Sequence, residues 1–378
     1  MPYYNDEIFH TLALTRLGFF HIAEMRLLLD KAGSAKALFD FRADIRQILP
    51  ECNMNIVNAF RNCDEALRRA EVELQFIEKH RIKCFTINDA DYPQRLAECD
   101  DAPLVLFYLG SADLNKRHTV SVVGTRRCSV YGKDVTERFI GELKELCPDT
   151  LVVSGLAYGI DGAAHKKALQ EGLETVGVLA HGLDTLYPAA HRNMAKKMVG
   201  QGGLLTEYFQ QTRADRMNFL RRNRIVAGLT DATVIIESAY KGGSLSTARI
   251  ANEYNRDVFA VPGRIGDQYS EGCNTLIAKN KAQIFINALD FVQAMGWNSE
   301  QTLQKARNEG IQTSLFPSLS PEEQRIVNVL KSNNDLQINT LSVQSQTPIA
   351  QLSSLLFDLE MEGIVKALPG GIYHLVGL

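Results

Sequence analysis

Apolar residues follow two different spacings along the chain. From residue 1 to about residue 105 they recur at the three- and four-residue spacing of amphipathic helices, as in IFHTLALTRL, AEMRLLLDKA and DEALRRAEVELQFIEKH. Two short apolar runs around a turn-rich stretch, KCFTI and PLVLFYLG, close this part. From Val120 to about Trp297, apolar runs alternate with helical segments; the runs are TVSVVG, TLVVSG, TVGVLA, GLLTEY, ATVIIES, DVFAVPG and AQIFI.

Continuous Val, Ile and Leu runs are typical of parallel strands that are buried on both faces, and strand–helix alternation is typical of a doubly wound sheet. We therefore predict an α/β protein with a helical domain and short connecting strands at residues 1–105. An extended Rossmann-like, doubly wound and mostly parallel sheet is predicted at 106–298.

The last eighty residues contain a break and then a new pattern. Residues 299–317 lack a clear apolar face, and we predict a linker there. Ser320 with Glu323 three residues later forms a capping-box pattern at a helix start. Two more helical segments and a hairpin at Pro369-Gly370-Gly371 follow, which predicts a small winged-helix domain at 318–378.

The overall composition is that of a soluble globular protein, with 45% hydrophobic and 22% charged residues in 378. No apolar run reaches the roughly 18 residues that a membrane span needs, and MPYYNDEIFH lacks the basic and apolar regions of a secretory signal. The seven cysteines are scattered and form no CxxC pair, which favours reduced thiols over disulfides or structural zinc. We therefore expect a cytoplasmic protein without a metal.

The net charge of −3 conceals two basic islands. Residues 213–224 carry five arginines against one aspartate, and residues 117–133 carry four basic residues and no acid, so that each island has a local charge of +4. Local charge matters more than the sum for attracting a polyanion. A solvated charged face is the alternative for each island.

Three predicted strands end in short turns that contain glycine. These turns are Gly124-Thr125-Arg126-Arg127, Ser154-Gly155, and Gly242-Gly243-Ser244, which Thr247 follows. Backbone N–H groups in such turns, and at the helix starts behind them, attract anions, and two arginines can bind phosphate bidentately. Because the carboxyl ends of parallel strands meet at the ligand-binding edge of an open sheet, the three turns predict a phosphate-binding rim.

The segment MNFLRRNRIVAGLT predicts a helix with arginines near its start and the apolar residues IVAGL against the sheet. Phe219 lies in the middle of the basic island at 213–224. Single-strand binding combines guanidinium groups that hold phosphates with a ring on which a base stacks. A buried hydrophobic anchor is the alternative for Phe219.

Two kinds of enzyme site are suggested and then disfavoured by the spacing. Ser154, Asp161 and His165 resemble a hydrolase set, but Asp161 and His165 share one helical face and no GxSxG elbow surrounds the serine. A metal would need a third ligand at suitable spacing. The turn at Gly124 is neither GxGxxG nor a P-loop, so no nucleotide cofactor is predicted.

Seven segments together resemble the DNA-processing protein A family, also called DprA or Smf; they are VGTRRCSVYG, SGLAYGIDGAAHKKAL, GLDTLYPAAHRN, FLRRNRIVAGLT, ESAYKGGSLSTA, FAVPG and GCNTLI. They follow the order and spacing of the family over about residues 72–290. The N-terminal helices (SAM-like or helix-hairpin-helix-like) and the winged helix are also placed as in that family. The resemblance implies a homodimer that binds single-stranded DNA independently of sequence, protects incoming DNA and loads RecA recombinase onto it in natural transformation, with no established catalytic activity.

The resemblance also assigns roles to individual residues. It implies a phosphate turn at Gly124, Thr125 and Arg126, in which threonine replaces the usual serine before arginine. It implies that Arg216 is a basic contact residue three positions before a base-contacting aromatic, Phe219. Asn223 and Arg224 then belong to an RNR element, and Gly243, Ser244 and Thr247 to a second anion cradle. The GCNTLI segment, with Asn274, Leu276 and Ile277, is the implied candidate for dimer or recombinase contact.

Three segments depart from what the resemblance implies. FQQTRADRMN replaces the proline-rich approach to the aromatic residue, and LTRLGFFHIAEMRLLL lacks a Gly-x-Gly hairpin, so DNA contact by the N-terminal helices is not predicted. The winged-helix segment Ile349 to Glu362 has no Lys or Arg and three acids, whereas a recognition helix is normally basic. We predict a protein-contacting or intramolecular role for this domain.

Two other functions stay open. The first is a nucleotide phosphoribohydrolase of the lysine-decarboxylase-like group, which resembles PGGxGTxxE. The segment KGGSLSTAR departs from that motif, because Leu245 stands at its glycine, Ser246 at its threonine and Arg249 at its glutamate. The second is an adaptor that binds only proteins, which leaves both arginine islands without a ligand.

Overall fold

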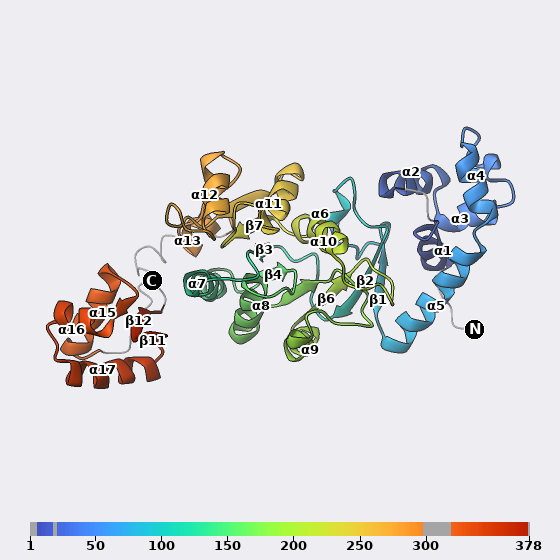
Figure 1. The fold of residues 1–378 in the computed structure, drawn as a ribbon. Coiled ribbons are helices and arrows are strands. Elements are labelled where there is room, and N and C mark those ends of the chain that lie inside the picture. The colour runs from blue at the N-terminus through green and yellow to red at the C-terminus, as the bar shows by residue number, and fades with distance from the viewer. Residues whose placement is uncertain (1–5, 18–20, 298–318, 377–378) are drawn as a thin grey trace.

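The computed structural model describes residues 6–17, 21–297 and 319–376. Helices of the N-terminal part lie at one end, an α/β domain occupies the middle, and a small C-terminal domain lies at the other end (Figure 1). The predicted linker at 299–317 falls outside the described residues. Within the described residues, no helix is both long enough and apolar enough to cross a membrane.

The N-terminal helices pack around a core of their own. They are α1 (Asp6–Leu14), α2 (Ile22–Ala32), α3 (Ala35–Asp40), α4 (Met54–Arg61) and α5 (Asp64–His80), with a 3-10 turn at Ile45–Gln47. The helices bury apolar side chains in this core, among them Leu12 of α1, Leu38 of α3, Phe60 of α4 and Leu74 of α5. The side chain of Ser34 caps α3 by accepting a hydrogen bond from the Ala37 N–H, which fixes where that helix begins.

Nine strands form one sheet in the order β1-β2-β6-β5-β4-β3-β7-β8-β9. Their bounds are β1 (Lys83–Thr86), β2 (Val105–Gly110), β3 (Thr119–Val123), β4 (Leu151–Ser154), β5 (Thr175–Val178), β6 (Gly202–Thr206), β7 (Ala232–Ile235), β8 (Asp257–Ala260) and β9 (Gln283–Ile284). The strands from β3 to β9 pair in parallel, whereas β2 pairs antiparallel with β1 and β6. The predicted Rossmann-like, mostly parallel sheet is therefore confirmed.

The α/β domain begins earlier than the predicted boundary near residue 105. Strands β1 and β2 belong to the nine-stranded sheet, because β2 pairs with β6 from Phe107 to Gly110. The two short apolar runs that close the N-terminal third are thus the antiparallel edge of the sheet. A short apolar run by itself does not show which partner strand it will pair with.

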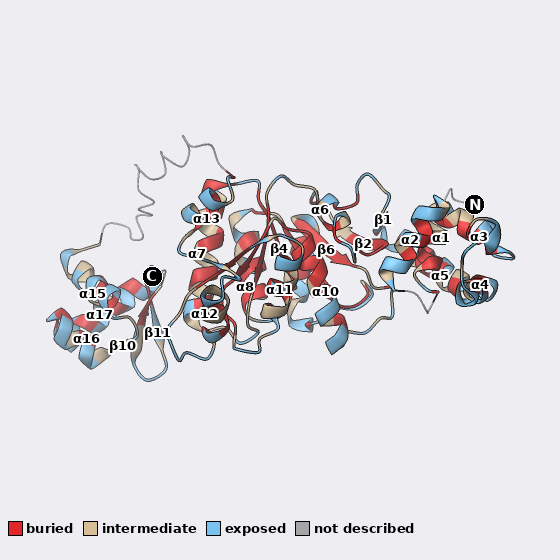
Figure 2. Ribbon diagram, turned by 90° about the horizontal axis from the view of Figure 1, so that it is seen from above, coloured by how far each residue is buried: buried red, intermediate tan, exposed pale blue. Residues whose placement is uncertain are grey.

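Helices cover both faces of the sheet. They are α6 (Gln94–Ala97), α7 (Val130–Leu146), α8 (Ile160–Glu171), α9 (Arg192–Gly200), α10 (Arg216–Gly228), α11 (Ser244–Glu253), α12 (Glu271–Ala278) and α13 (Ala288–Ala294). Val120 and Val122 of β3 pack in one core cluster with residues of α7, α8 and α13, and Val123 packs in another with α10 and α11. This alternation is the two-residue period of a strand buried on both faces, and Figure 2 shows the central strands as buried.

The C-terminal domain has the predicted elements. Helices α15 (Pro321–Ser332), α16 (Ile338–Ser345) and α17 (Ile349–Met361) pack on strands β10 (Leu336–Gln337), β11 (Val365–Leu368) and β12 (Ile372–Leu375). Ser320 and Glu323 form the predicted capping box. His374 of β12 lies 2.6 Å from Asp134 of α7 and 2.7 Å from Asp335, so one imidazole joins the winged helix to the α/β domain.

Candidate nucleic-acid interface

A pocket of about 500 Å³ opens at the carboxyl ends of β3 and β7. The chain runs from β3 outward through β4, β5 and β6, and then returns to place β7 on the other side of β3. This reversal is a topological switch point, where the loops of neighbouring strands diverge and leave space for a ligand. The residues that line the pocket are Val123, Gly124, Thr125, Arg126, Ala157, Asp161, Tyr187, Ala214, Asp215, Arg216, Phe219, Leu220, Arg222, Asn223, Ala239, Gly242, Gly243, Ser244 and Thr247.

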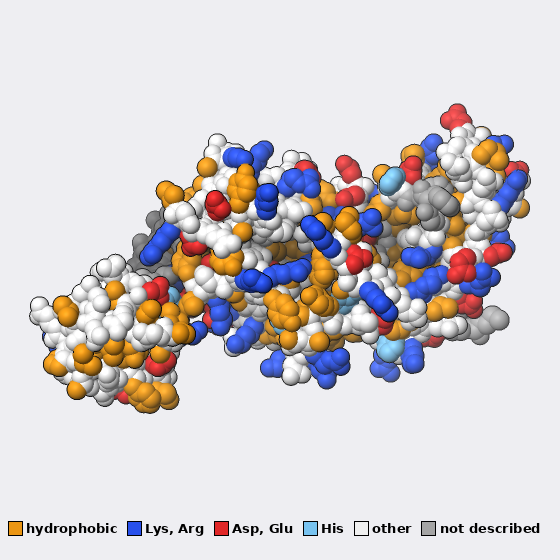
Figure 3. All heavy atoms as spheres, viewed as in Figure 1, with side chains coloured by type: hydrophobic (Ala, Val, Ile, Leu, Met, Phe, Trp, Pro, Cys, Tyr) orange, Lys and Arg blue, Asp and Glu red, His pale blue; other side chains and the backbone are white. Residues whose placement is uncertain are grey.

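Ten of the fourteen predicted DNA-contacting residues line this one pocket. They come from the turn after β3, from α10, and from the turn and first helical residues after β7. Arg126, Arg216 and Gly243 are therefore gathered at one rim, as the sequence predicted. In the view of Figure 3, Lys and Arg side chains lie beside hydrophobic ones near the middle of the α/β domain.

The turn after β3 is held by close backbone packing. The Thr125 N–H donates to the Glu237 carbonyl at 2.8 Å, and a Cβ on Gly124 would come within 2.5 Å of Ile160. Ser129 caps α7 by accepting from the Gly132 N–H at 3.0 Å. Only glycine fits at 124, and this turn holds Arg126 at the mouth of the pocket.

Phe219 lies on the first turns of α10, and two neighbouring groups hold it. The Arg126 guanidinium carbon lies 4.8 Å from the centroid of the ring, and the Tyr187 ring packs edge-on with a centroid distance of 5.6 Å. Asp215 caps the helix by accepting from the Asn218 N–H at 2.8 Å, which places Arg216 at the exposed first position. A ring flanked by guanidinium groups at a pocket mouth is the arrangement that stacks a base while its phosphate is neutralised.

Arg222 is a further candidate for DNA contact, and the sequence pattern did not single it out. Its side chain lines the pocket although the residue is only 4% exposed, and its Nε atom has no hydrogen-bond partner among the described residues. Burial lowers the pKa of Arg222, the Asp161 carboxylate counteracts this, and the Arg126 charge lowers it further. Arginine nevertheless stays protonated in proteins, so the pocket holds an under-compensated buried cation that an anion would stabilise.

Helical spacing is the signal that could have identified Arg222. Residues 216, 219, 222 and 223 are three or four positions apart and share one face of α10. Gly155, which the sequence assigned to an anion turn, has a different role. A Cβ at this position would lie 1.6 Å from Nη1 of Arg222, so Gly155 makes room for the guanidinium.

The second cradle is formed at the start of α11. Gly243 is the N-cap residue and has no side-chain cap, and a Cβ there would meet no atom within 4 Å. A Cβ on Gly242, in contrast, would lie 2.2 Å from Oγ of Ser238, the hydroxyl to which Ser244 donates at 2.9 Å. The fold therefore requires glycine at 242, whereas the space beside Gly243 is open.

Four predicted residues do not line the pocket. Arg127 is exposed beside it. The Ser154 hydroxyl donates to the Val122 carbonyl at 2.7 Å, and Gly155 donates its N–H to Asp161 at 3.1 Å. Arg224 lies on the opposite face of α10, where its buried guanidinium pairs with Glu207 at 2.5 Å. Arg224 therefore has its own carboxylate partner.

The Ser154, Asp161 and His165 set does not form a hydrolase site. His165 is buried, and its Nδ1–H donates to the hydroxyl of Thr175, which itself donates to the Val152 carbonyl. Burial lowers the pKa of His165 to about 3, so this imidazole is neutral. The serine hydroxyl is directed to a carbonyl, and the described residues contain no group of three or more metal-ligating side chains.

The predicted contact residues on α12 have mixed surroundings. Asn274 accepts a hydrogen bond from the Gly263 N–H and donates to the Gly263 carbonyl, at 3.1 and 3.0 Å, so its amide holds the adjacent loop. Leu276 and Ile277 are partly buried against the core. The segment stays a prediction for dimer or recombinase contact.

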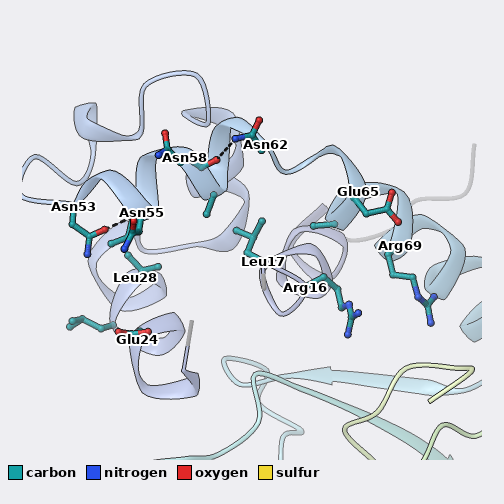
Figure 4. A pocket seen from close by; sticks show the side chains of 14 residues that line it. Arg16, Leu17, Glu24, Leu28, Asn53, Asn55, Asn58, Asn62, Glu65 and Arg69 are labelled. Carbon is teal, nitrogen blue, oxygen red and sulfur yellow. Dashed lines mark hydrogen bonds between the residues drawn. The ribbon is translucent and has the colours of Figure 1, made fainter. Parts of the chain in front are cut away.

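A second cavity, of about 840 Å³, lies among the N-terminal helices (Figure 4). Arg16 and Arg69 at its edge point the same way, and both guanidinium groups lie over the Phe209 ring, at 5.4 and 5.2 Å. Arg69 also pairs with the buried Glu73 at 3.1 Å, so its charge already has a carboxylate partner. This cavity is lined by no predicted DNA-contacting residue and does not form an anion site.

Comparison with known proteins decides the family. A family model described as DNA recombination-mediator protein A matches residues 83–296, which is more than half of the chain. A second model, described as the DprA winged helix domain, matches residues 313–371. The chain belongs to the DprA family. The predicted winged helix is thereby confirmed.

Individual members of the DprA family support this assignment. The DNA processing protein DprA of Streptococcus pneumoniae is 42% identical over 200 residues, which are 53% of this chain and 70% of that protein. The X-ray structure of the S. pneumoniae protein superposes with a TM-score of 0.65 at 34% identity, covering 78% of this chain and 98% of that one. A structure of DNA processing protein A from Helicobacter pylori, described by its single-stranded DNA binding mode, has a TM-score of 0.52 at 29% identity and covers 57% and 95% of the two chains.

Proposed function

We propose that this chain binds single-stranded DNA independently of sequence at the pocket between β3 and β7. The observation that carries the proposal is the gathering of Arg126, Arg216 and Arg222 around the ring of Phe219, with glycine turns on both sides. Guanidinium groups and turn amides recognise phosphates, which carry no sequence information, and a phenyl ring stacks on any base. The H. pylori relative, whose single-stranded DNA binding mode has been described, supports the same use of the fold.

The aromatic residue favours a single strand over a duplex. Phe219 is half-buried at the mouth of a pocket, so only an unpaired base can reach its ring. In a duplex the base faces are stacked on one another and are inaccessible without extrusion. We therefore expect duplex DNA to bind through its phosphates alone, and more weakly.

The family model's description as a recombination mediator supports a role in loading a RecA-type recombinase. We further propose, from the family resemblance alone, that the chain acts in the cytoplasm as a homodimer. The partly buried α12 residues Leu276 and Ile277 are the proposed contact for the second copy or the recombinase. The acidic winged helix is proposed to contact protein rather than DNA. Its intramolecular contact from His374 to Asp134 of α7 is one interaction of this kind.

We propose binding rather than catalysis at this site. The position of the phosphoribohydrolase glutamate is occupied by Arg249, which pairs with Glu253 four residues later on α11. A cation there has the wrong charge to assist cleavage of a ribosyl bond. Release of free base from nucleoside monophosphates by the purified protein would overturn this assignment.

The DNA-binding proposal is tested by fluorescence anisotropy with a labelled oligothymidylate. Arg126→Glu is expected to raise the Kd about 10- to 150-fold, because charge-assisted hydrogen bonds contribute roughly 1.5–3 kcal/mol. It should also flatten the dependence of log Kd on log salt, since fewer counterions are released. Arg61→Glu, at an exposed position of α4, is the matched control. Wild-type affinity in Arg126→Glu would refute the phosphate-turn assignment.

Recombinase loading is tested separately. Recombinase filaments are assembled on oligonucleotides already coated with a single-strand-binding protein, with and without this chain. Faster assembly supports the mediator role, and an unchanged rate in the presence of intact DNA binding would contradict it.

A further inference from the structure

A second aromatic pair lies just beyond the pocket. The rings of Tyr158 and His191 pack edge-on with a centroid distance of 5.3 Å. Tyr158 directly follows the pocket residue Ala157, and His191 lies four residues after the pocket residue Tyr187. The aromatic groups Phe219, Tyr187 and the Tyr158–His191 pair thus lead from the pocket toward α9.

Both tyrosines of this group are exposed at the surface. Tyr158 and Tyr187 are each 45% exposed, and neither phenol makes a hydrogen bond within the described part of the chain. One of the two ring nitrogens of His191 is directed inward, since Nδ1 lies 3.0 Å from the Leu156 carbonyl oxygen. This contact fixes the imidazole, so that it supports the Tyr158 ring at the surface.

Helix α9, which begins directly after His191, supplies a third basic island. Between Thr185 and Thr206 the sequence has Arg192, Lys196 and Lys197 and no Asp or Glu. All three cations are exposed, and none forms an ion pair within the described residues. Nine residues at 1.5 Å each make α9 about 14 Å long, which extends the positive surface well past the pocket.

We infer that a strand held in the pocket continues over Tyr187 and the Tyr158–His191 pair, where further bases stack, while Arg192 and Lys196 of α9 hold the phosphates. This inference rests on the proposed function. Stacking tolerates every base because each has a π-face, and unpaired cations beside exposed rings are the surface that single strands follow. The pocket then holds the first nucleotides, and this aromatic and basic track binds those that follow.

The track makes the affinity depend on oligonucleotide length. Anisotropy is measured with oligothymidylates of about 4 and about 16 nucleotides, the range of site sizes in single-strand-binding folds. Tyr158→Ala is expected to weaken binding of the longer strand about 5- to 150-fold, or about 1–3 kcal/mol at 1.4 kcal/mol per tenfold, and to leave the shorter one within twofold. Tyr158→Phe keeps the ring and should bind both lengths as wild type does. Phe41→Ala, at an exposed ring of the N-terminal domain, is the matched control.

The cations are tested through salt. The double variant Arg192→Ala/Lys196→Ala should lower the slope of log Kd against log salt by about 1.4 for the longer strand, at roughly 0.7 for each phosphate neutralised. Lys31→Ala/Arg61→Ala removes two exposed charges from the N-terminal helices and should not change the slope. An unchanged slope in the α9 variant would overturn the track.

The outcomes separate this inference from the proposed function. Wild-type binding of the longer strand by Tyr158→Ala, together with weakened binding of both lengths by Phe219→Ala, overturns the track and leaves the pocket. If wild-type protein binds neither length, the proposed function itself is wrong. Should Tyr158→Ala fail to fold, wild-type protein is irradiated with a 16-mer that carries a photoreactive pyrimidine at successive positions. Crosslinks to Tyr158 or His191 support the track, and crosslinks confined to the pocket residues refute it.

Discussion

Substitution of Gly155 tests whether the buried guanidinium of Arg222 binds phosphate. An alanine Cβ at 155 would lie 1.6 Å from Nη1 of Arg222, whereas ordinary contacts begin near 3.4 Å, so the guanidinium must move by the difference, about 1.8 Å. Overpacking a buried site costs roughly 1–3 kcal/mol of unfolding free energy. Loss of a charge-assisted hydrogen bond to DNA costs about 1.5–3 kcal/mol of binding free energy, or roughly 10- to 150-fold in Kd.

Four variants separate these two effects in assays of denaturant unfolding and oligonucleotide anisotropy. Gly155→Ala should lose both stability and DNA affinity. The double variant Gly155→Ala/Arg222→Met should regain the stability lost to the clash, but its affinity should stay as low as that of Arg222→Met alone. Gly243→Ala controls for loss of a glycine, because φ is −64° and the space is open, so its unfolding free energy should stay within about 0.5 kcal/mol of wild type. Wild-type affinity in folded Gly155→Ala would refute phosphate binding by Arg222.

Three further predictions concern the ring, the buried histidine and the buried ion pair. Phe219→Ala should weaken single-strand binding by about 1–3 kcal/mol in anisotropy titrations. Leu220→Ala changes an exposed residue of the same pocket and should weaken binding less, because leucine offers no stacking surface. Burial lowers the pKa of His165 from 6.5 to about 3, so protons bind the unfolded chain more tightly, and the stability present above pH 6.5 is lost as the pH falls toward 3. Between about pH 8 and pH 5 the unfolding free energy measured in denaturant titrations should fall by about 2 kcal/mol for this reason. His165→Gln should lack this part of the pH dependence. Arg224→Met strands the Glu207 carboxylate and should lower the unfolding free energy by roughly 3–5 kcal/mol, and retained DNA affinity in the folded fraction would distinguish this structural role from a DNA contact.

Local chemistry in the sequence was sufficient to predict most of the α/β domain. The apolar runs from TVSVVG to DVFAVPG became strands with parallel neighbours, and such runs are typical of strands that are buried on both faces. AQIFI became the short edge strand β9, whose two residues are exposed. The turn at Gly124 and the helix that begins at Arg216 are also local features, set by a glycine and by the Asp215 cap. Since strand ends of a parallel sheet share one edge, the rim that gathers Arg126 and Gly243 could be predicted from the sequence.

Tertiary packing decided which arginine of FLRRNR faces the pocket. Arg222 and Arg224 are two positions apart in the same basic run, yet about 200° of helical rotation separates them. One therefore points into the pocket beside Asp161, and the other lies against Glu207 on the far side of α10. The sequence shows the rotation between the two residues but not which side of the helix the sheet will cover. The membership of β1 and β2 in the sheet has the same origin, because strand pairing is a long-range contact that no local pattern specifies.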